Sequence, residues 1–204
     1  MFGPERANAG SPASRLGRVA LRNSTESVLG NGVLGRAFDY WTRIGNGAAM
    51  PMRRDLDPMD MGPALLPHSL LTDVDLAVGN VRHRVVGTSV AESFGRDITG
   101  IDLSEVLRGS YYDFIHGLFM LTCKRRLPVF SHSQFRWDEG RMLRTSRLMM
   151  PLSRDGRNAD MAFMVQVFEH EMPPALPHVQ IFEDGSWLDI SEQYAFFAVD
   201  APVL

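Results

Sequence analysis

The order of strand-like and helix-like segments is the feature that most constrains this chain of 204 residues. A stretch at 70–76 alternates between apolar and polar side chains, and Gly79-Asn80 offers a hairpin turn before a return strand at 81–87. Helical segments follow, and the run closes with three strands joined by short turns, at 128–137, 142–152 and 161–169. Short turns make those three strands antiparallel neighbours.

This order predicts a sheet that is built from two separate pieces. An early hairpin and a late three-stranded meander are bridged by short helices at 91–94 and 102–107 and by a longer helix at 110–126. We therefore predict an α+β fold with a five-stranded antiparallel sheet, helices on one face of it, and an additional N-terminal helix. The space between the sheet and its helices is the natural place for a ligand pocket.

Changes in composition divide the chain into four segments. Residues 1–23 are rich in Gly, Ala, Ser, Pro and Arg, which is typical of a disordered arm. Residues 24–49 hold a helix from Ser24 to Ile44, ended by a glycine-rich turn. The predicted domain covers 50–171, and 172–204 form a C-terminal extension with a further hairpin at 179–190.

Bulky aromatic residues stand out in the two segments that flank the domain. The N-terminal helix carries an apolar stripe that includes Phe38 and Trp41, and the extension carries Trp187 and Phe197. An exposed apolar stripe of this size is uncommon on a monomer. Two interpretations stay open. These four residues are candidate contacts with a partner or a second chain, or each packs against its own domain.

The acidic run around Asp55, Asp57 and Asp60 resembles a metal site but fits a helix start better. Asp57 is placed to cap a helix whose first residue is Pro58, where the missing N–H has no cost. Asp60 then faces the positive end of the helix dipole. We predict a short helix at 58–66, which ends before Pro67.

The overall composition argues against several classes of protein. A net charge of −3 gives no attraction to nucleic acid or to an anionic membrane. No apolar run approaches the roughly 18 residues of a membrane span. Cys123 is the only cysteine, so an internal disulfide is excluded, and a reducing cytoplasm is the expected location.

Three short motifs occur in order behind Trp41. They are RRDLDP at 53–58, Arg84-x-x-Gly87-Thr88, and Gly95-Arg96-Asp97-x-Thr99-Gly100. In order and spacing they resemble the bacterial stand-alone PAS family, over about 38–168.

The resemblance implies a sensory domain that signals through contacts with other proteins, and it carries over no catalytic residue. Arg84, Arg96 and Asp97 are then either ligand-binding residues or an arrangement that holds the glycine loop, the more frequent role of such pairs.

Two residues of the long predicted helix, His116 and Cys123, decide whether a cofactor is expected. His116 is a candidate ligand-binding residue, because haem-binding PAS domains use a histidine on the corresponding helix. A lone helix histidine is more often exposed or hydrogen-bonded, so haem is not expected. A flavin adduct is not expected either, because Cys123 lies outside the short-helix region where such a cysteine stands. The six histidines lack metal-site spacing, and no metal is expected.

These observations together favour a non-catalytic cytoplasmic sensor. Its length leaves no room for an output domain, so we expect it to act in trans on an unidentified signalling protein and to form a homodimer. Two alternatives remain. One is a small α+β enzyme that uses His116 or His132 with a carboxylate such as Asp113. The other is a dimerisation module without a ligand. The identity of any ligand stays open.

Overall fold

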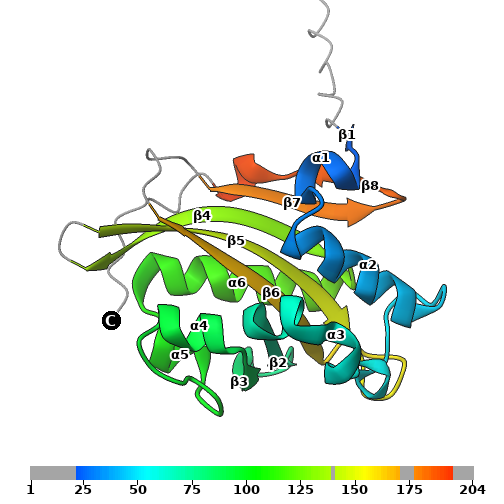
Figure 1. Cartoon of the computed structure of the whole chain (residues 1–204), viewed down its shortest axis with the longest axis horizontal. Helices are drawn as coiled ribbons and strands as arrows, with labels where there is room; N and C mark the ends of the chain where they lie inside the picture. Colours follow the sequence, from blue (N-terminus) through cyan, green and yellow to red (C-terminus); the bar gives the residue numbers. More distant parts are fainter. Residues whose placement is uncertain (1–21, 139–140, 171–176, 195–204) are drawn as a thin grey trace, which may run out of the picture.

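A computed structural model describes residues 22–138, 141–170 and 177–194 of the chain (Figure 1). The predicted arm up to residue 21 and the tail that contains Phe197 lie outside these ranges. The described strands form one antiparallel sheet in the order β1-β8-β7-β4-β5-β6-β2-β3. Their bounds are β1 Arg22–Asn23, β2 Ser69–Asp75, β3 Asn80–Val86, β4 Val129–Asp138, β5 Arg141–Leu152, β6 Met161–His170, β7 His178–Glu183 and β8 Ser186–Asp189.

The five central strands confirm the predicted split sheet. The early hairpin β2–β3 joins the late meander β4–β5–β6 because β2 pairs with β6, with Ser69 opposite Val165 and Asp73 opposite Met161. The C-terminal hairpin β7–β8 forms where it was predicted, and it extends the same sheet by pairing β7 with β4. The described sheet therefore has eight strands instead of five. An added hairpin covers backbone groups that an edge strand would leave open.

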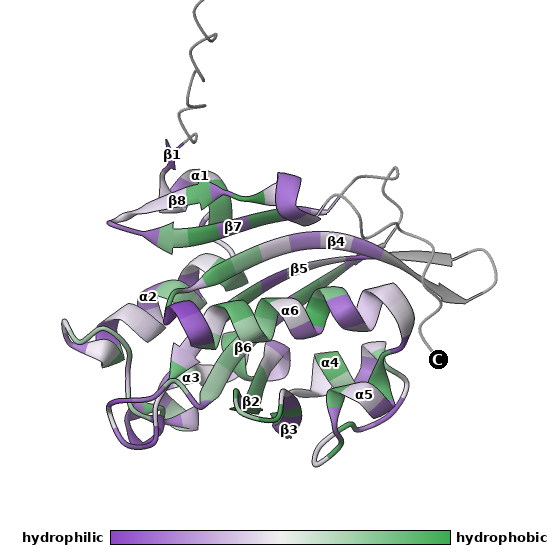
Figure 2. Cartoon of the chain, turned by 180° about the vertical axis from the view of Figure 1, so that it is seen from behind, coloured by the Kyte–Doolittle hydropathy of each residue, from purple (hydrophilic) through white to green (hydrophobic). Residues whose placement is uncertain are grey.

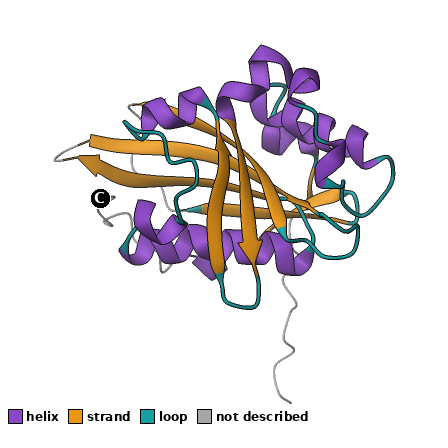
Figure 3. Cartoon of the chain, turned by 90° about the horizontal axis from the view of Figure 1, so that it is seen from below, coloured by secondary structure: helices purple, strands orange, loops and turns teal. Residues whose placement is uncertain are grey.

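Helices lie on both sides of this sheet (Figure 3). One face carries α4 (Thr88–Ser93), α5 (Leu103–Val106) and α6 (Gly109–Arg125). The other carries α2 (Val33–Gly45) and the adjoining α3 (Pro58–Leu65). Trp41 of α2 donates a hydrogen bond from Nε1 to the Pro151 carbonyl at 2.9 Å, and Tyr40 packs edge-on against Phe163. The predicted helix layer on one face is thus joined by the N-terminal helix on the other.

The predicted N-terminal helix is broken into α1 (Thr25–Leu29) and α2. Ser24 caps α1 by accepting a hydrogen bond from the Ser27 N–H at its Oγ. Gly30 has a positive φ of 60°, and its carbonyl lies so near Gly35 that a Cβ there would meet the oxygen at 2.1 Å. The glycines therefore allow a sharp turn that the apolar pattern alone did not indicate.

The aromatic stripe of α2 packs inside the chain. Phe38 lies 4.9 Å from Phe182 and 5.6 Å from Trp187, between ring centroids. Phe38, Trp41 and Trp187 are only 7%, 8% and 0% exposed. Three of the four candidate contact aromatics therefore form a core that joins α2 to the C-terminal hairpin, and they present no exposed aromatic surface.

The acidic run begins a helix, as predicted. Asp57 accepts a hydrogen bond from the Met59 N–H at its Oδ1, at 2.9 Å, and α3 starts at Pro58. The Tyr40 hydroxyl accepts from the Asp57 N–H and donates to the Asp57 carbonyl, at 2.9 and 3.1 Å. This double contact ties α2 to the start of α3.

Replacing Phe38 by alanine should test the aromatic core. We expect Phe38→Ala to lower the free energy of unfolding by about 3–5 kcal/mol, because it leaves a cavity between α2 and the hairpin. Chemical denaturation of the full chain measures the change. Arg36→Ala, an exposed position of the same helix, is the control and should change stability by at most about 0.5 kcal/mol. Equal effects of the two substitutions would contradict this packing.

Candidate functional site

A small cavity lies between the sheet and α4–α6, where the sequence predicted a ligand pocket. Its volume is about 20 Å³, room for about one water molecule. Figure 2 views the molecule from the side on which α6 lies across the sheet. The cavity wall is mostly apolar and includes Leu70, Phe94, Ile98, Leu103, Val106, Leu107, Ile115, Phe119 and Met164.

Four polar side chains interrupt this apolar wall. They are His83 of β3, Tyr111 of α6, Arg147 of β5 and Gln166 of β6. Arg147 and Gln166 lie directly opposite each other in the register of β5 and β6. They are 2% and 3% exposed. The central strands therefore bring a charged group and an amide to the wall of the same cavity.

Arg147 is a buried charge that is surrounded by hydroxyl groups. It donates to Ser133 Oγ at 2.8 Å, and further hydrogen bonds go to the Tyr111 hydroxyl and Thr145 Oγ1. Its guanidinium carbon also lies 5.5 Å from the centre of the Tyr111 ring. Burial lowers the pKa of Arg147, and Tyr111 opposes this. A guanidinium remains protonated in proteins, so the positive charge persists in the interior.

His83 is a buried neutral residue beside the same cavity. It is 2% exposed, and its Nδ1 lies 3.1 Å from Thr72 Oγ1. Burial lowers its pKa from 6.5 to about 4, with a weaker opposing effect from Asp102. At neutral pH the imidazole therefore adds polarity to the cavity wall without adding charge.

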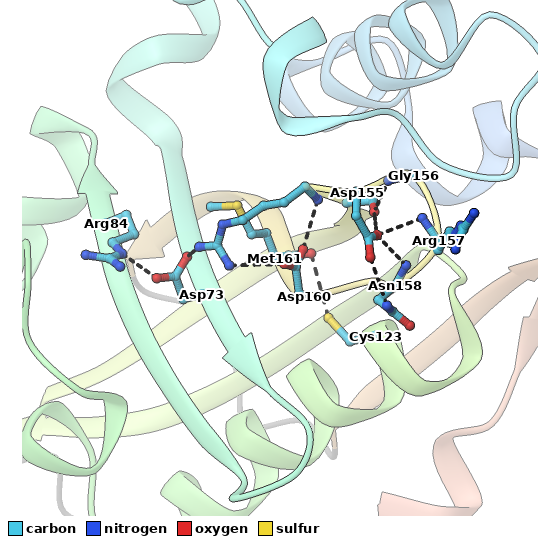
Figure 4. A network of polar contacts seen from close by, with 11 residues as sticks. Asp73, Arg84, Cys123, Asp155, Gly156, Arg157, Asn158, Asp160 and Met161 are labelled. Atoms are coloured by element: carbon cyan, nitrogen blue, oxygen red, sulfur yellow. Dashed lines mark hydrogen bonds and ion pairs between the residues drawn. The ribbon is translucent and has the colours of Figure 1, made fainter.

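The four predicted ligand-binding residues lie away from this cavity, and Arg84 belongs to a surface network. Its Nε donates to one oxygen of Asp73 (Figure 4), and Arg154 donates to the other oxygen. Arg154 also pairs with Asp160 at 3.1 Å. About half of each arginine side chain is exposed, so these pairs contribute little energy individually. Together the three ion pairs connect β2, β3 and the turn between β5 and β6.

Arg96 and Asp97 hold the loop between α4 and α5. Arg96 Nη2 donates to the Glu105 carbonyl at 3.4 Å. Asp97 accepts from the Thr99 N–H at 2.8 Å, and hydrogen bonding from Thr99 lowers the pKa of Asp97. Asp97 therefore stabilises a turn within the loop, and Arg96 connects the loop to α5.

The histidines that were considered for cofactor or catalytic chemistry do not converge. His116 Nε2 lies 2.8 Å from the Gly79 carbonyl, and its ring stacks on Tyr112. Haem ligation through that nitrogen would break the bond to Gly79. His132 Nδ1 bonds Ser146 Oγ at 2.8 Å in a groove that α1 borders, on the other face of the sheet. Asp113 is exposed on α6. The predicted catalytic group of His116 or His132 with Asp113 is therefore not assembled.

His178 takes part in a second polar cluster that the sequence did not indicate. Its Nδ1 lies 3.0 Å from Ser191 Oγ and 3.6 Å from Asp189 Oδ2. Ser191 Oγ also donates to Asp189 at 2.6 Å and accepts from the Val179 N–H at 2.9 Å. The hydroxyl is thus committed to closing the C-terminal hairpin and is not presented to a substrate.

Cys123 is a core residue. Its side chain is 2% exposed and its Sγ contacts the Met161 carbonyl at 3.7 Å. Burial raises the pKa of the thiol to about 12, so it stays protonated and unreactive. Across the described ranges, no three His, Cys, Asp or Glu residues come together as a metal site. In the same part of the chain no helix has the length and apolarity to span a membrane.

Neither Arg147 nor Gln166 was selected from the sequence. The only available signal was their position within strands, two residues from Met149 and Met164, which places each polar residue on the same face as an apolar neighbour. That position did not identify them as site residues. In a sequence, a polar strand residue that faces the interior cannot be distinguished from one that faces solvent, and here both faces of the strands are covered.

Stability should depend on pH through His83. The pKa of His83 is lower in the folded chain than in the unfolded chain. Its contribution to the free energy of unfolding is therefore complete above pH 6.5 and is lost as the pH falls toward 4. We expect His83 to account for a loss of about 2 kcal/mol between pH 7 and pH 5. Denaturation of His83→Asn at both pH values should show a loss smaller by that amount. Parallel losses in the two proteins would contradict a neutral buried His83.

Comparison with known proteins agrees with this architecture. A model of the PAS domain family matches residues 33–164, which run from the start of α2 into β6. A search of curated proteins found no match. A search of solved structures found none either. The match spans well over half of the chain and covers most of the central sheet, α2 and all three helices that enclose the cavity, and the chain therefore belongs to the PAS domain family.

Proposed function

We propose that this chain is a non-catalytic sensory module that acts in trans, as a cytoplasmic homodimer, on a signalling protein. Membership of the PAS family supports a sensory or signalling role in general. The observation that carries the finer proposal is the cavity between the sheet and α4–α6. Buried polar groups in an apolar wall are typical of a site that orients a small ligand.

The helices around the cavity offer a path from a ligand to the surface. Leu103 and Val106 touch the cavity from α5, and Tyr111 and Ile115 touch it from α6. The same helices carry exposed residues, among them Glu105 and Asp113. The helices that line the cavity therefore also form part of the surface that a partner can contact. This arrangement supports signalling by contact over catalysis.

Substitution of Val106 tests whether the cavity controls a partner. Val106→Ile adds one methylene group to a wall residue that is 1% exposed, and such overpacking has a modest cost in stability. We expect capture of the protein partner by the tagged full chain in its own cells to change severalfold in this variant. The control is Glu105→Ala, an exposed neighbour on α5, which should leave capture unchanged.

Native mass spectrometry of the same proteins tests the homodimer. We expect a dimer from the original chain and from both variants. A monomer at all concentrations would remove the homodimer from the proposal. Partner capture that is identical in Val106→Ile and in the original chain would remove control by the cavity.

A further inference from the structure

The positive charge of Arg147 lacks an anionic partner within the described ranges. Its hydrogen bonds there go to three neutral hydroxyl groups, from Ser133, Tyr111 and Thr145. A buried charge without a counter-charge is strongly unfavourable, and hydroxyl dipoles and an aromatic face offset only part of the cost. A guanidinium has five N–H donors, so two of them have no acceptor among these partners.

Gln166 adds a second, independent observation. Its side chain lines the cavity, is 3% exposed, and has no hydrogen-bond partner in the part of the chain that the structure describes. Buried amides are normally hydrogen-bonded. Gln166 lies opposite Arg147 on the neighbouring strand, and both side chains line the same cavity.

We propose that this cavity binds one small monovalent anion, held by the Arg147 guanidinium and the Gln166 amide. The inference rests on the proposed sensory function and names the ligand class for the same site. A water molecule would fill a space of about 20 Å³, but it would leave the charge uncompensated. A halide or a one-carbon carboxylate supplies the charge at a similar size.

Thermal unfolding of the full chain tests the site. Sodium chloride and sodium formate are compared with sodium gluconate, whose anion is too large, at equal ionic strength. At about ten times its Kd, a bound anion should raise Tm by about 3–6 °C over the gluconate value. The two arms distinguish a spherical halide from a planar carboxylate, which can form paired hydrogen bonds with arginine.

Gln166→Glu is the decisive variant. It places a carboxylate of the same shape opposite Arg147 and should take the place of the bound anion. We expect its Tm to be the same in chloride, formate and gluconate. Arg147→Met should also lose the anion effect, and if that protein does not fold, Gln166→Glu decides alone. Arg157→Met, at an exposed arginine, is the control and should keep the full shift.

A second measurement reads the anion directly. The NMR linewidth of chloride should broaden on adding the original chain and Arg157→Met, and should not broaden on adding Gln166→Glu. The inference is overturned if chloride and formate give no more stabilisation than gluconate, or if the shift is equal in Gln166→Glu and the original chain. The Tm shift and the chloride linewidth can be measured without a protein partner. If the anion raises Tm but no partner is captured, the sensory function is refuted and the anion site is retained.

Discussion

The pairing of β2 with β6 is the contact on which the rest of this structure depends. It joins Ser69–Asp73 to strand residues about ninety positions later, and it converts a hairpin and a meander into one sheet. The chain between them must then cross one face of that sheet, which is where α4, α5 and α6 lie. The cavity is the space that remains between these three helices and the central strands. Without this pairing, Arg147 and His83 would belong to separate pieces of structure.

Coverage of both faces follows from the flanking segments. Helix α2 lies on the face opposite α6 and is held there by the contacts of Phe38 with Phe182 and Trp187. The C-terminal hairpin is held in turn by pairing with β4. A sheet that is buried on both sides leaves its inward polar residues out of water, which is why a charge such as Arg147 acquires unusual energetic weight. The segments that flank the central sheet are thus part of what defines its interior.

Some of the fold followed from local rules that the chain obeys independently of its distant parts. Asp57 and Pro58 begin a helix because the cap and the fixed proline angle act within a few residues. The hairpin turn between β7 and β8 formed around Asp184 and Gly185, both with positive φ, as its composition predicted. The break between α1 and α2 was missed because the apolar pattern continues across it, while Gly30 and Gly35 touch through the backbone.

The candidate site, in contrast, depends on contacts between segments that lie far apart in the chain. By itself, the sequence determined the order of strands and helices, the helix caps, the turns and the motifs of the family, because each depends on neighbouring residues and on a period of two or 3.6. Only the tertiary structure decided that Phe38 packs on Trp187, that Arg84 and Arg96 hold turns and loops, and that Arg147 meets Gln166 beside a cavity. The physical reason is that register and burial arise between segments far apart in the chain, so the partner of a buried charge is defined only once the strands have paired.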